Sequence, residues 1–564
     1  MYLTGAQILR TLLERQGIAT IAGMPGGAIL PFYDALHSTD GDGTIRHVLA
    51  RHEQGAGFIA QGMARVTGRA AVCLATSGPG ATNLLTAIAD AQLDSIPLVA
   101  ITGQVPQALI GTDAFQEVDT YGLTLPITKH NFLVHSVEEL LETVPLAFTL
   151  AESGRPGPVA IDVPKDVLNA RLEVGIWPAP GGRRTAPSCD EAQILQLAQQ
   201  LKHARQPVLY LGGGVIAADA AGLARALAHR LSAPVVSTLM ALGAMPPDDP
   251  LFMGMLGMHA AKGTNFLLEE ADLLVAIGAR FDDRATGKVA EFCPRAAIAH
   301  IDIDPAEHGK IKQPMLSLVG DAADILRRLL AHVPQQARSA WCARAAELRA
   351  AHPLVHPTRD DDPLHPINLC RSLAEVLPDD TIVATDVGQH QMWVAQAYPF
   401  RQPRTLLTSG GLGTMGFGLP AAIGAALAAP GRRVLCVSGD GSILMNIQEL
   451  ATLAELDLPV AVVIFNNGGL GLVRQQQQLL YQQHYSASRF HATPDFAAMA
   501  RAFGIRGVRL DPADNPLEAL REALAADGPC VIDVPIEPTA NVYPMVPPGA
   551  ANRQMIAEPA LSHA

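Results

Sequence analysis

The chain has 564 residues, of which 49% are hydrophobic and 17% are charged. This composition provides enough apolar material for several buried cores, and it excludes a disordered or fibrous chain. The formal net charge is −13, which argues against a nucleic-acid partner because a phosphate backbone repels an acidic protein.

Other features of the composition argue against a membrane or secreted protein. No run of about 18 apolar residues is present, so we expect no membrane-spanning helix. The N-terminal segment lacks the apolar core of a secretion signal, because Arg10, Glu14 and Arg15 interrupt it. The seven cysteines lie far apart and never form a CxxC pair. We therefore expect neither disulfides nor a zinc site, and a cytoplasmic location.

Short apolar runs rich in β-branched residues alternate with longer Ala- and Leu-rich stretches. In chain order, the expected strands are residues 71–76, 97–103, 158–164, 207–213, 273–279, 297–303, 381–387, 433–439, 459–465 and 530–536. These runs are continuously apolar rather than alternating, as in strands that helices cover on both faces. The sequence therefore predicts an α/β protein with doubly wound parallel sheets.

Two stretches rich in proline, glycine and charge interrupt this alternation. Residues 177–188 and 352–366 are interpreted as linkers between domains. They divide the chain into three domains of similar size, at residues 1–180, 188–345 and 363–550. A tail, residues 551–564, is expected to form a flexible arm or lid.

Glycine-rich turns follow several expected strands, at the sheet edge where open parallel sheets bind ligands. Glycine allows backbone N–H groups to approach a phosphate, but a tight turn between strand and helix also needs glycine for steric reasons. Each turn alone therefore supports a phosphate site and a purely structural role about equally. The turns lie at residues 77–83, 213–215, 439–442 and 466–471.

The third domain contains a more specific pattern. Asp440, in Gly439-Asp440-Gly441, follows one strand, and Asn467 follows the next strand, one helix and one strand later. Carboxylate and carboxamide oxygens at neighbouring strand ends suit Mg²⁺, which completes its coordination shell with diphosphate oxygens and water. The alternative is a capping Asp and an unrelated Asn turn. The spacing resembles the diphosphate-binding pattern of thiamine diphosphate enzymes.

Segments from nearly the whole chain resemble the large, catalytic subunit of acetolactate synthase, also called acetohydroxyacid synthase. They are residues 23–36, 51–57, 75–105, 111–119, 154–167, 253–259, 278–288, 385–393, 409–426 and 439–450. Among the types of this enzyme, isozyme II of enteric bacteria looks most similar. The resemblance implies three α/β domains of the thiamine diphosphate-binding fold, with a middle FAD-associated domain that is Rossmann-like.

The resemblance also implies an activity and an assembly. Pyruvate would be decarboxylated on thiamine diphosphate, and the two-carbon unit would be joined to a second small 2-keto acid. This is the first common step of branched-chain amino acid biosynthesis, which includes isoleucine and valine. The coenzyme would lie between the first domain of one subunit and the third domain of another, in a homodimer or homotetramer. A small regulatory subunit could also bind.

The resemblance assigns roles to individual residues. Glu53 would bond the pyrimidine N1′ nitrogen and activate the coenzyme. Asp440 and Asn467 would bind Mg²⁺ through their side chains, and Gly469 through its carbonyl. Met415 would lie under the thiazolium ring and impose the bent shape of the coenzyme. The other expected coenzyme neighbours are Pro25, Gly26, Ser77, Asn83, Phe115, Gln116, Val387, Gly388, Gln389, His390, Gly413, Gly439, Gly441 and Ser442.

Gln104, Phe115 and Lys165 resemble residues of the substrate channel. A lysine after a strand is more often solvated, but an acidic substrate gives Lys165 a carboxylate to attract.

The middle domain carries the sequence RFDDR at residues 280–284. In the family this motif accompanies FAD, so the resemblance implies a flavin with a structural role. Arg284 would face the carboxylate of the second keto acid, where a guanidinium group pairs well. Without the resemblance, the motif would be interpreted as a charged loop with internal ion pairs. The residues expected at FAD are Arg155, Gly213, Gly214, Met258, His259, Arg280, Asp282, Arg284, Asp302, Asp304 and Asp321.

Gln476 departs from the family pattern. Biosynthetic enzymes usually carry a tryptophan here, which packs against the extra methyl group of 2-ketobutyrate. Loss of such a contact should cost about 1–3 kcal/mol of discrimination. Catabolic acetolactate synthases tend to carry Gln. We therefore expect mainly 2-acetolactate, with a pyruvate-only, catabolic type as the alternative.

Three other functions fit parts of the sequence. A thiamine diphosphate-dependent oxidase or simple decarboxylase would share the fold, but RFDDR and residues 111–117 argue against it. A non-catalytic nucleotide-binding or regulatory subunit would not need Glu53, Asp440 and Asn467 together. A dehydrogenase is disfavoured because no GxGxxG motif opens a helix with an acidic residue about 20 positions later.

Overall fold

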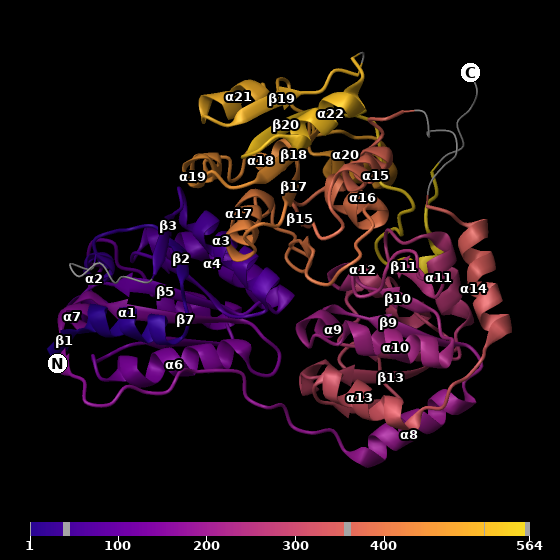
Figure 1. Ribbon diagram of the computed structural model, residues 1–564, viewed down its shortest axis with the longest axis horizontal. Coiled ribbons are helices and arrows are strands. Elements are labelled where there is room, and N and C mark those ends of the chain that lie inside the picture. The colour runs from indigo at the N-terminus through magenta and orange to yellow at the C-terminus, as the bar shows by residue number, and fades with distance from the viewer. Residues whose placement is uncertain (1, 38–44, 355–361, 513, 559–564) are drawn as a thin grey trace.

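The computed structural model describes residues 2–37, 45–354, 362–512 and 514–558. They form three α/β domains, each built on a six-stranded parallel sheet (Figure 1). All ten expected strands are present, and the predicted fold class is confirmed. The expected linker at 352–366 lies partly outside the described residues, as does the end of the tail.

Domain 1 contains the N-terminal sheet. Its strands are ordered β3 (Arg46–Leu49), β2 (Thr20–Gly23), β4 (Ala71–Ala75), β5 (Leu98–Gln104), β7 (Pro158–Pro164) and β6 (His130–Leu133), all parallel. Its helices are α1 (Gly5–Arg15), α2 (Leu30–Leu36), α3 (Glu53–Thr67), α4 (Pro79–Asp94), α5 (Thr120–Thr124), α6 (Glu139–Glu152) and α7 (Lys165–Asn169). An antiparallel pair, β1 (Tyr2–Thr4) and β8 (Arg171–Glu173), joins the two ends of the domain.

Domain 2 follows an extended connection between β8 and α8 (Glu191–His203), which contains the expected linker 177–188 (Figure 1). The sheet order is β11 (Phe252–Met255), β10 (Val235–Ser237), β9 (Pro207–Leu211), β12 (Leu273–Ile277), β13 (Ala297–Asp302) and β14 (Leu316–Val319). The remaining helices are α9 (Gly213–Ala217), α10 (Ala221–Leu231), α11 (Lys262–Glu270), α12 (Asp283–Thr286), α13 (Ala322–His332) and α14 (Ser339–Ala351).

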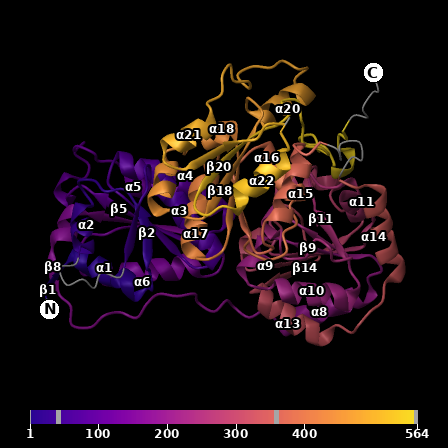
Figure 2. The ribbon, with the colours of Figure 1, turned by 45° about the horizontal axis from the view of Figure 1, so that its top comes forward.

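Domain 3 has the sheet order β16 (Leu406–Leu407), β15 (Ile382–Thr385), β17 (Val434–Gly439), β18 (Val460–Asn466), β20 (Cys530–Pro535) and β19 (Arg506–Arg509). Its helices are α15 (Pro366–Val376), α16 (Gln389–Ala397), α17 (Gly418–Ala428), α18 (Asp440–Ile443), α19 (Glu449–Leu456), α20 (Gly471–Leu480), α21 (Phe496–Ala502) and α22 (Pro516–Ala525). Figures 1 and 2 show this domain, in orange to yellow, lying across the junction of the other two.

The strands are buried because helices cover both faces of each sheet. Every residue of β4, β5, β7, β17 and β18 is buried. This explains why their sequences are continuously apolar. The carboxyl ends of the strands in each sheet point to one edge, and the glycine-rich turns lie there.

Domains 1 and 3 are joined through the close packing of α3 against α17. Two glycines allow this approach. A Cβ atom at Gly62 would lie 2.2 Å from the carbonyl oxygen of Ala421, and one at Gly424 would lie 2.0 Å from that of Ile59. The two helices therefore approach closely enough for backbone to contact backbone.

The described part of the tail packs on domain 2. Asn552 is buried, its Nδ2 donates to the carbonyl of Ala285 at 2.9 Å, and its own carbonyl accepts from Asn265 at 3.4 Å. These contacts hold Asn552 against domain 2, and the expectation of a flexible arm or lid stays a prediction.

Among the residues that the structure describes there is neither a membrane-spanning helix nor a disulfide. No helix there is long and apolar enough to cross a membrane. The seven cysteines, all of them described, form no disulfide.

The α3–α17 contact predicts a steric sensitivity at Gly424. We expect Gly424→Ala to destabilise the domain 1–domain 3 unit by about 1–3 kcal/mol, because the added methyl group must displace backbone. Urea denaturation followed by circular dichroism measures this as a lower midpoint. Gly222→Ala in α10 is the matched control, because nothing lies within 4 Å of its Cβ position. Equal midpoints for the two variants would contradict the role given to Gly424.

Candidate functional site

Asp440 lies at the carboxyl end of β17, as the first residue of α18. Its side chain is buried. Oδ1 accepts a hydrogen bond from the N–H of Gly441 at 3.0 Å, and Oδ2 accepts one from the N–H of Gly469 at 3.0 Å. Burial raises the pKa of Asp440 to about 6. These N–H groups hold the carboxylate in one orientation.

Asn467 presents an oxygen that has no protein partner. Its Nδ2 donates to Oε1 of Gln389 at 3.2 Å, whereas its Oδ1 is buried without a hydrogen bond among the described residues. A buried polar atom without a partner needs an explanation, and a carboxamide oxygen is a suitable Mg²⁺ ligand. The residues present therefore fit the predicted metal. Gly469 cannot carry a side chain, because a Cβ atom there would lie 2.3 Å from the carbonyl oxygen of Ser488.

Gln389 belongs to a buried amide network beside this site. Its Nε2 donates to Oε1 of Gln475 at 2.8 Å and to the carbonyl of Ala540 at 2.9 Å. Gln475 in turn donates to the carbonyl of Val542 at 2.9 Å. Thus α20 and the segment after β20 fix Gln389, which orients Asn467. The sequence analysis missed Gln475, since glutamine in a polyglutamine run carries no local signal.

His390 is a second buried group with an unpartnered atom. Its Nε2 has no hydrogen bond among the described residues, and burial lowers its pKa to about 3. Gly388 and Gly439 lie against its ring, with Cβ positions 2.9 Å and 3.0 Å from ring atoms. The two predicted glycines therefore make room for a neutral imidazole at the carboxyl ends of β15 and β17.

Asp386 organises the loops around these residues, and the sequence analysis did not identify it. Its Oδ1 accepts from the N–H groups of Val387 at 2.9 Å and Gly416 at 2.8 Å, and its Oδ2 from Gly418 at 3.3 Å. Complete burial raises its pKa to about 6. Ser442 adds a hydrogen bond to the carbonyl of Val387 at 2.8 Å.

The middle of the loop that Asp386 anchors remains accessible. Gly413 is exposed, with a φ of 71° that favours glycine, and Met415 is half-buried.

Glu53 is half-buried at the start of α3. Its Oε2 accepts a hydrogen bond from Nδ2 of Asn83 at 2.9 Å, so one predicted residue orients the other. Burial, with the nearby charge of Glu53, raises the pKa of the Tyr33 hydroxyl well above its ordinary value.

The other domain 1 residues form turns around Glu53. Gly26 lies against the side chain of Thr76, and Gly78 lies against the backbone of Gln116. Ser77 is buried, and Pro25 is exposed. Phe115 is 89% exposed. In the part of the chain that the structure describes, no hydrogen bond or ion pair joins Glu53 to Asp440, Asn467 or Gly469.

Gln104 is buried, and its polar atoms have partners within domain 1. Its Nε2 donates to Oδ2 of Asp162 at 2.9 Å and to the carbonyl of Val118 at 3.0 Å, and its Oε1 accepts from the N–H of Val105. Burial raises the pKa of Asp162 to about 7. Lys165, the first residue of α7, is half-buried three positions after Asp162 in the chain.

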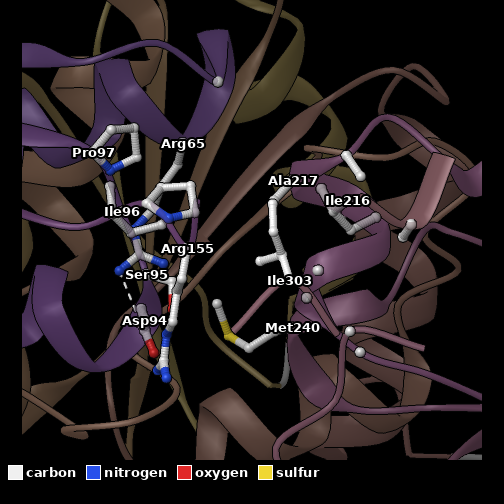
Figure 3. Close-up of a pocket in the computed structure, with 18 of the residues that line it drawn as sticks. Arg65, Asp94, Ser95, Ile96, Pro97, Arg155, Ile216, Ala217, Met240 and Ile303 are labelled. Carbon is white, nitrogen blue, oxygen red and sulfur yellow. Dashed lines mark hydrogen bonds and ion pairs between the residues drawn. The ribbon is translucent and has the colours of Figure 1, made fainter. Parts of the chain in front are cut away.

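A cavity of about 500 Å³ separates domains 1 and 2. In Figure 3, Arg65, Asp94, Ser95, Pro97 and Arg155 form one wall, whereas Ile216, Ala217, Met240 and Ile303 form the other. The predicted flavin residues that line it are Arg155, Gly213, Gly214, Arg280, Asp282, Asp302 and Asp321.

Arg155 joins the two walls of this cavity. Its Nε donates to Oγ of Ser95 at 2.8 Å, and its Nη1 contacts Asp304 at 3.3 Å and Glu307 at 2.7 Å. A Cβ atom at Gly214 would lie 2.6 Å from the Cα of Gly278, so the turn after β9 must stay small. Burial raises the pKa of Asp302, at the end of β13, to about 6.

Two polar atoms at the cavity have no protein partner. Nε of Arg65 and Oε2 of Glu307 are buried without hydrogen bonds among the described residues. A nucleotide offers both phosphate oxygens and hydroxyl groups, and a small turn followed by a helix suits such a ligand. The cavity therefore fits the predicted flavin nucleotide.

Four predicted residues lie apart from the lining of this cavity: Asp304, which contacts Arg155, and Met258, His259 and Arg284. His259 lines a second cavity, of about 230 Å³, and burial lowers its pKa to about 4. Met258 lies beside it, and its N–H donates to the carbonyl of Arg284 at 2.8 Å. The side chain of Arg284 is 65% exposed and lies 3.7 Å from Asp283. RFDDR thus contains the internal ion pair of the alternative interpretation.

Gln476 is exposed on α20, one turn from the exposed Val473. This face of α20 is accessible to a substrate or to another chain.

Comparison with known protein families identifies each domain. Three family descriptions match: "Thiamine pyrophosphate enzyme, N-terminal TPP binding domain" at residues 3–123, "Thiamine pyrophosphate enzyme, central domain" at 194–329, and "Thiamine pyrophosphate enzyme, C-terminal TPP binding domain" at 386–534. Thiamine pyrophosphate is thiamine diphosphate.

Curated relatives match nearly the whole chain. The acetolactate synthase isozyme 1 large subunit of Escherichia coli is 54% identical, over 98% of both chains. The isozyme 2 large subunit of the same organism is 48% identical, over 98% of this chain and 99% of its own. A probable acetolactate synthase large subunit of Methanocaldococcus jannaschii is 46% identical, over 97% and 94%.

The expected nearness to isozyme II is wrong for this pair of relatives, since isozyme 1 is the more similar. The chain belongs to the acetolactate synthase large subunits of the thiamine pyrophosphate enzyme family.

Proposed function

We propose that this protein decarboxylates pyruvate and joins the two-carbon unit to a second 2-keto acid, mainly another pyruvate, to give 2-acetolactate. The observation that carries the proposal is that domains 1 and 3 each hold polar side chains already oriented for the coenzyme. Glu53 is oriented by Asn83, and Asp440 lies with the unpartnered oxygen of Asn467 at neighbouring strand ends. When bound, thiamine diphosphate supplies a carbon nucleophile and an electron sink for the charge left by departing CO₂.

Glu53 would hold a proton at the pyrimidine N1′ nitrogen. The hydrogen bond from Asn83 fixes one carboxylate oxygen and leaves the other, Oε1, to face the coenzyme. Gly80 lies beside this oxygen, since a Cβ atom there would be in ordinary van der Waals contact with Oε1, at 3.4 Å. A carboxylate held in this way exchanges a proton without reorganising.

Asp440, Asn467 and Gly469 would hold Mg²⁺ and, through it, the diphosphate. The N–H groups of Gly441 and Gly469 orient the Asp440 carboxylate, and Gln389 orients the Asn467 carboxamide. Two oxygen ligands from side chains and one from a backbone carbonyl leave room for phosphate oxygens and water in an octahedral shell.

Lys165 and Arg284 would attract the carboxylates of the keto acids. Both are cations that remain at least partly accessible in an otherwise acidic chain. Local positive charge at the site draws anionic substrates into it despite the overall charge.

We propose that two copies of the chain form each site, in a homodimer or homotetramer. Large exposed apolar side chains gather in segments next to predicted coenzyme residues: Leu109, Phe115, Leu123, Leu125, Leu412, Leu444, Met445 and Val473. Exposed apolar surface of this kind marks a protein interface. A second copy would cover these side chains and bring Glu53 of one chain toward Asp440 of another.

The cavity between domains 1 and 2 would hold FAD in a structural role. Its unpartnered Arg65 and Glu307 atoms and its Gly212–Gly214 turn support this assignment. Joining two keto acids with loss of CO₂ involves no net oxidation, so the flavin need not change its redox state. A smaller regulatory subunit is also proposed, since the curated relatives are named large subunits. The proposed location is the cytoplasm, and no nucleic acid or membrane partner is proposed.

The direct test is product analysis with the purified protein. We expect 2-acetolactate from pyruvate when thiamine diphosphate, Mg²⁺ and FAD are present, and a loss of product when any one is omitted. Acetaldehyde or acetate as the main product would instead indicate a simple decarboxylase or an oxidase.

Two inactive variants test whether the site needs two chains. Glu53→Gln and Asp440→Asn should each lower turnover at least about 100-fold, because the first cannot exchange the N1′ proton and the second weakens the metal site. In a hybrid dimer of one chain of each kind, one site combines the unchanged Glu53 of one chain with the unchanged Asp440 of the other. The second site carries both changes. Co-expression should therefore restore about a quarter of wild-type activity if the protein is a dimer with shared sites.

Circular dichroism provides the control that both variants are folded. A site made within one chain would give no recovery, because every site in the hybrid would then carry one of the changes.

Gln476→Trp tests the choice of the second substrate. A tryptophan would add apolar contact to the ethyl group of 2-ketobutyrate, so the preference for 2-ketobutyrate over pyruvate should rise about 10- to 200-fold. Competition between the two acids, with both products quantified, measures this ratio. Leu480→Ala, at the C-terminal end of α20, is the control for a general loosening of the helix. An unchanged ratio in Gln476→Trp would mean that this position does not contact the substrate.

A further inference from the structure

A single segment of domain 3 carries two of the predicted coenzyme residues. We call residues 408–417, between β16 and α17, the coenzyme loop, because it includes Gly413 and Met415. At its start, the N–H of Gly410 donates to Oδ2 of Asp94 at 3.0 Å, and the N–H of Gly411 donates to Oδ1 of Asp94 at 2.7 Å. The acceptor is the last residue of α4, in domain 1.

Asp90, one helical turn earlier, holds the next part of the loop. Its Oδ1 accepts hydrogen bonds from the hydroxyl groups of Ser409 and of Thr414, the latter at 3.3 Å. Ser409 Oγ also accepts from the N–H of Thr414 at 2.8 Å. The loop is therefore folded back on itself over two carboxylates from another domain, just before Met415.

Arg65, on α3, pairs with both acids and offsets part of their charge. Its Nη2 lies 3.2 Å from Asp90 and 2.8 Å from Asp94, and its Nη1 donates to the carbonyl of Thr408 at 3.0 Å. The Arg65 side chain is 5% exposed, and the side chains of both aspartates are fully buried. Burial and the charge of Asp94 raise the pKa of Asp90 to about 6. Two buried carboxylates on one guanidinium are an inefficient source of stability, but they fix one geometry.

The other side of this cluster faces the cavity between domains 1 and 2. Arg65 and Asp94 both line that cavity, and Figure 3 shows them on its domain 1 wall next to Ser95 and Arg155. Nε of Arg65 is buried and has no hydrogen-bond partner in the described chain. A ligand that contacts Arg65 from the cavity would hold the guanidinium, and with it Asp94, in the position that the coenzyme loop requires.

We propose that Asp94 is a positioning residue that joins the coenzyme loop to the wall of this cavity, so that a nucleotide bound in the cavity strengthens coenzyme binding. The inference rests on the proposed function, because it takes the loop as a thiamine diphosphate site. It gives a bound flavin an effect on coenzyme affinity that needs no electron transfer. Because coupling between two binding sites is reciprocal, the coenzyme must strengthen flavin binding by the same factor.

The test is a thermodynamic cycle with two ligands and two proteins. Calorimetry gives the dissociation constant of thiamine diphosphate, at saturating Mg²⁺, with and without FAD. In the wild type we expect FAD to lower it about 5- to 150-fold, the range of typical couplings. Asp94→Asn has one acceptor oxygen fewer and no charge, so we expect it to bind the coenzyme more weakly. For this variant, the ratio of the coenzyme dissociation constants without and with FAD should be near one. Flavin fluorescence shows separately whether FAD still binds.

A second variant tests the proposal in case Asp94→Asn does not fold. Ser409→Ala removes the hydroxyl that joins Asp90 to Thr414 and leaves all charges in place. It should also reduce the ratio. Glu138→Gln, an exposed acid at the start of α6, is the matched control and should behave like the wild type.

A ratio of one in the wild type, or equal ratios in wild type and folded Asp94→Asn, would overturn the proposal. Failure of the proposed function would look different, because the wild type itself would then bind no thiamine diphosphate or form no acetolactate.

Discussion

The backbone-to-backbone packing of α3 against α17 is the constraint on which the rest of the structure depends. It requires Gly62 and Gly424, and it fixes domain 1 relative to domain 3 within one chain. The same two helices bring Arg65 over the ring of Phe417, with the guanidinium carbon 4.8 Å from the ring centre. Because α3 begins with Glu53 and α17 follows the coenzyme loop, one packing contact positions parts of both predicted half-sites.

Much of the fold could be predicted because its strands are buried on both faces. Continuous apolar runs such as 71–76 and 433–439 became β4 and β17, within one or two residues at each end. The strands β10 and β16, of three and two residues, were missed because so short a run has no pattern of its own. The contact of Asn552 with domain 2 could not be predicted, because its partner Ala285 lies 267 positions away in the chain.

The residues of the candidate site also divide into those that the sequence could identify and those that it could not. Asp440, Asn467 and Glu53 follow strands or begin helices within recognisable sequences, so spacing and resemblance could identify them. Asp94 acts on Gly410 and Gly411 across 316 and 317 positions of the chain, and Asp386 on Gly416 across 30. A pattern within a short segment cannot reveal such partners.

The fit of other predicted residues depends on their surroundings. Gln104 is saturated with hydrogen bonds inside domain 1, so its direct contact with a substrate stays a prediction. Arg284 and Gln476 are exposed in the single chain, where only an assembly could enclose them.

Arg155 gives the seam between domains 1 and 2 a different character from the seam between domains 1 and 3. The first is bridged by the guanidinium of Arg155, which reaches from Ser95 to Asp304 and Glu307 beside a large cavity, whereas the second brings the backbones of α3 and α17 into contact. Domain 2 is thus attached to its neighbour by polar groups that water can replace. When the cavity is empty, domain 2 should therefore separate from domain 1 more readily than domain 3 does.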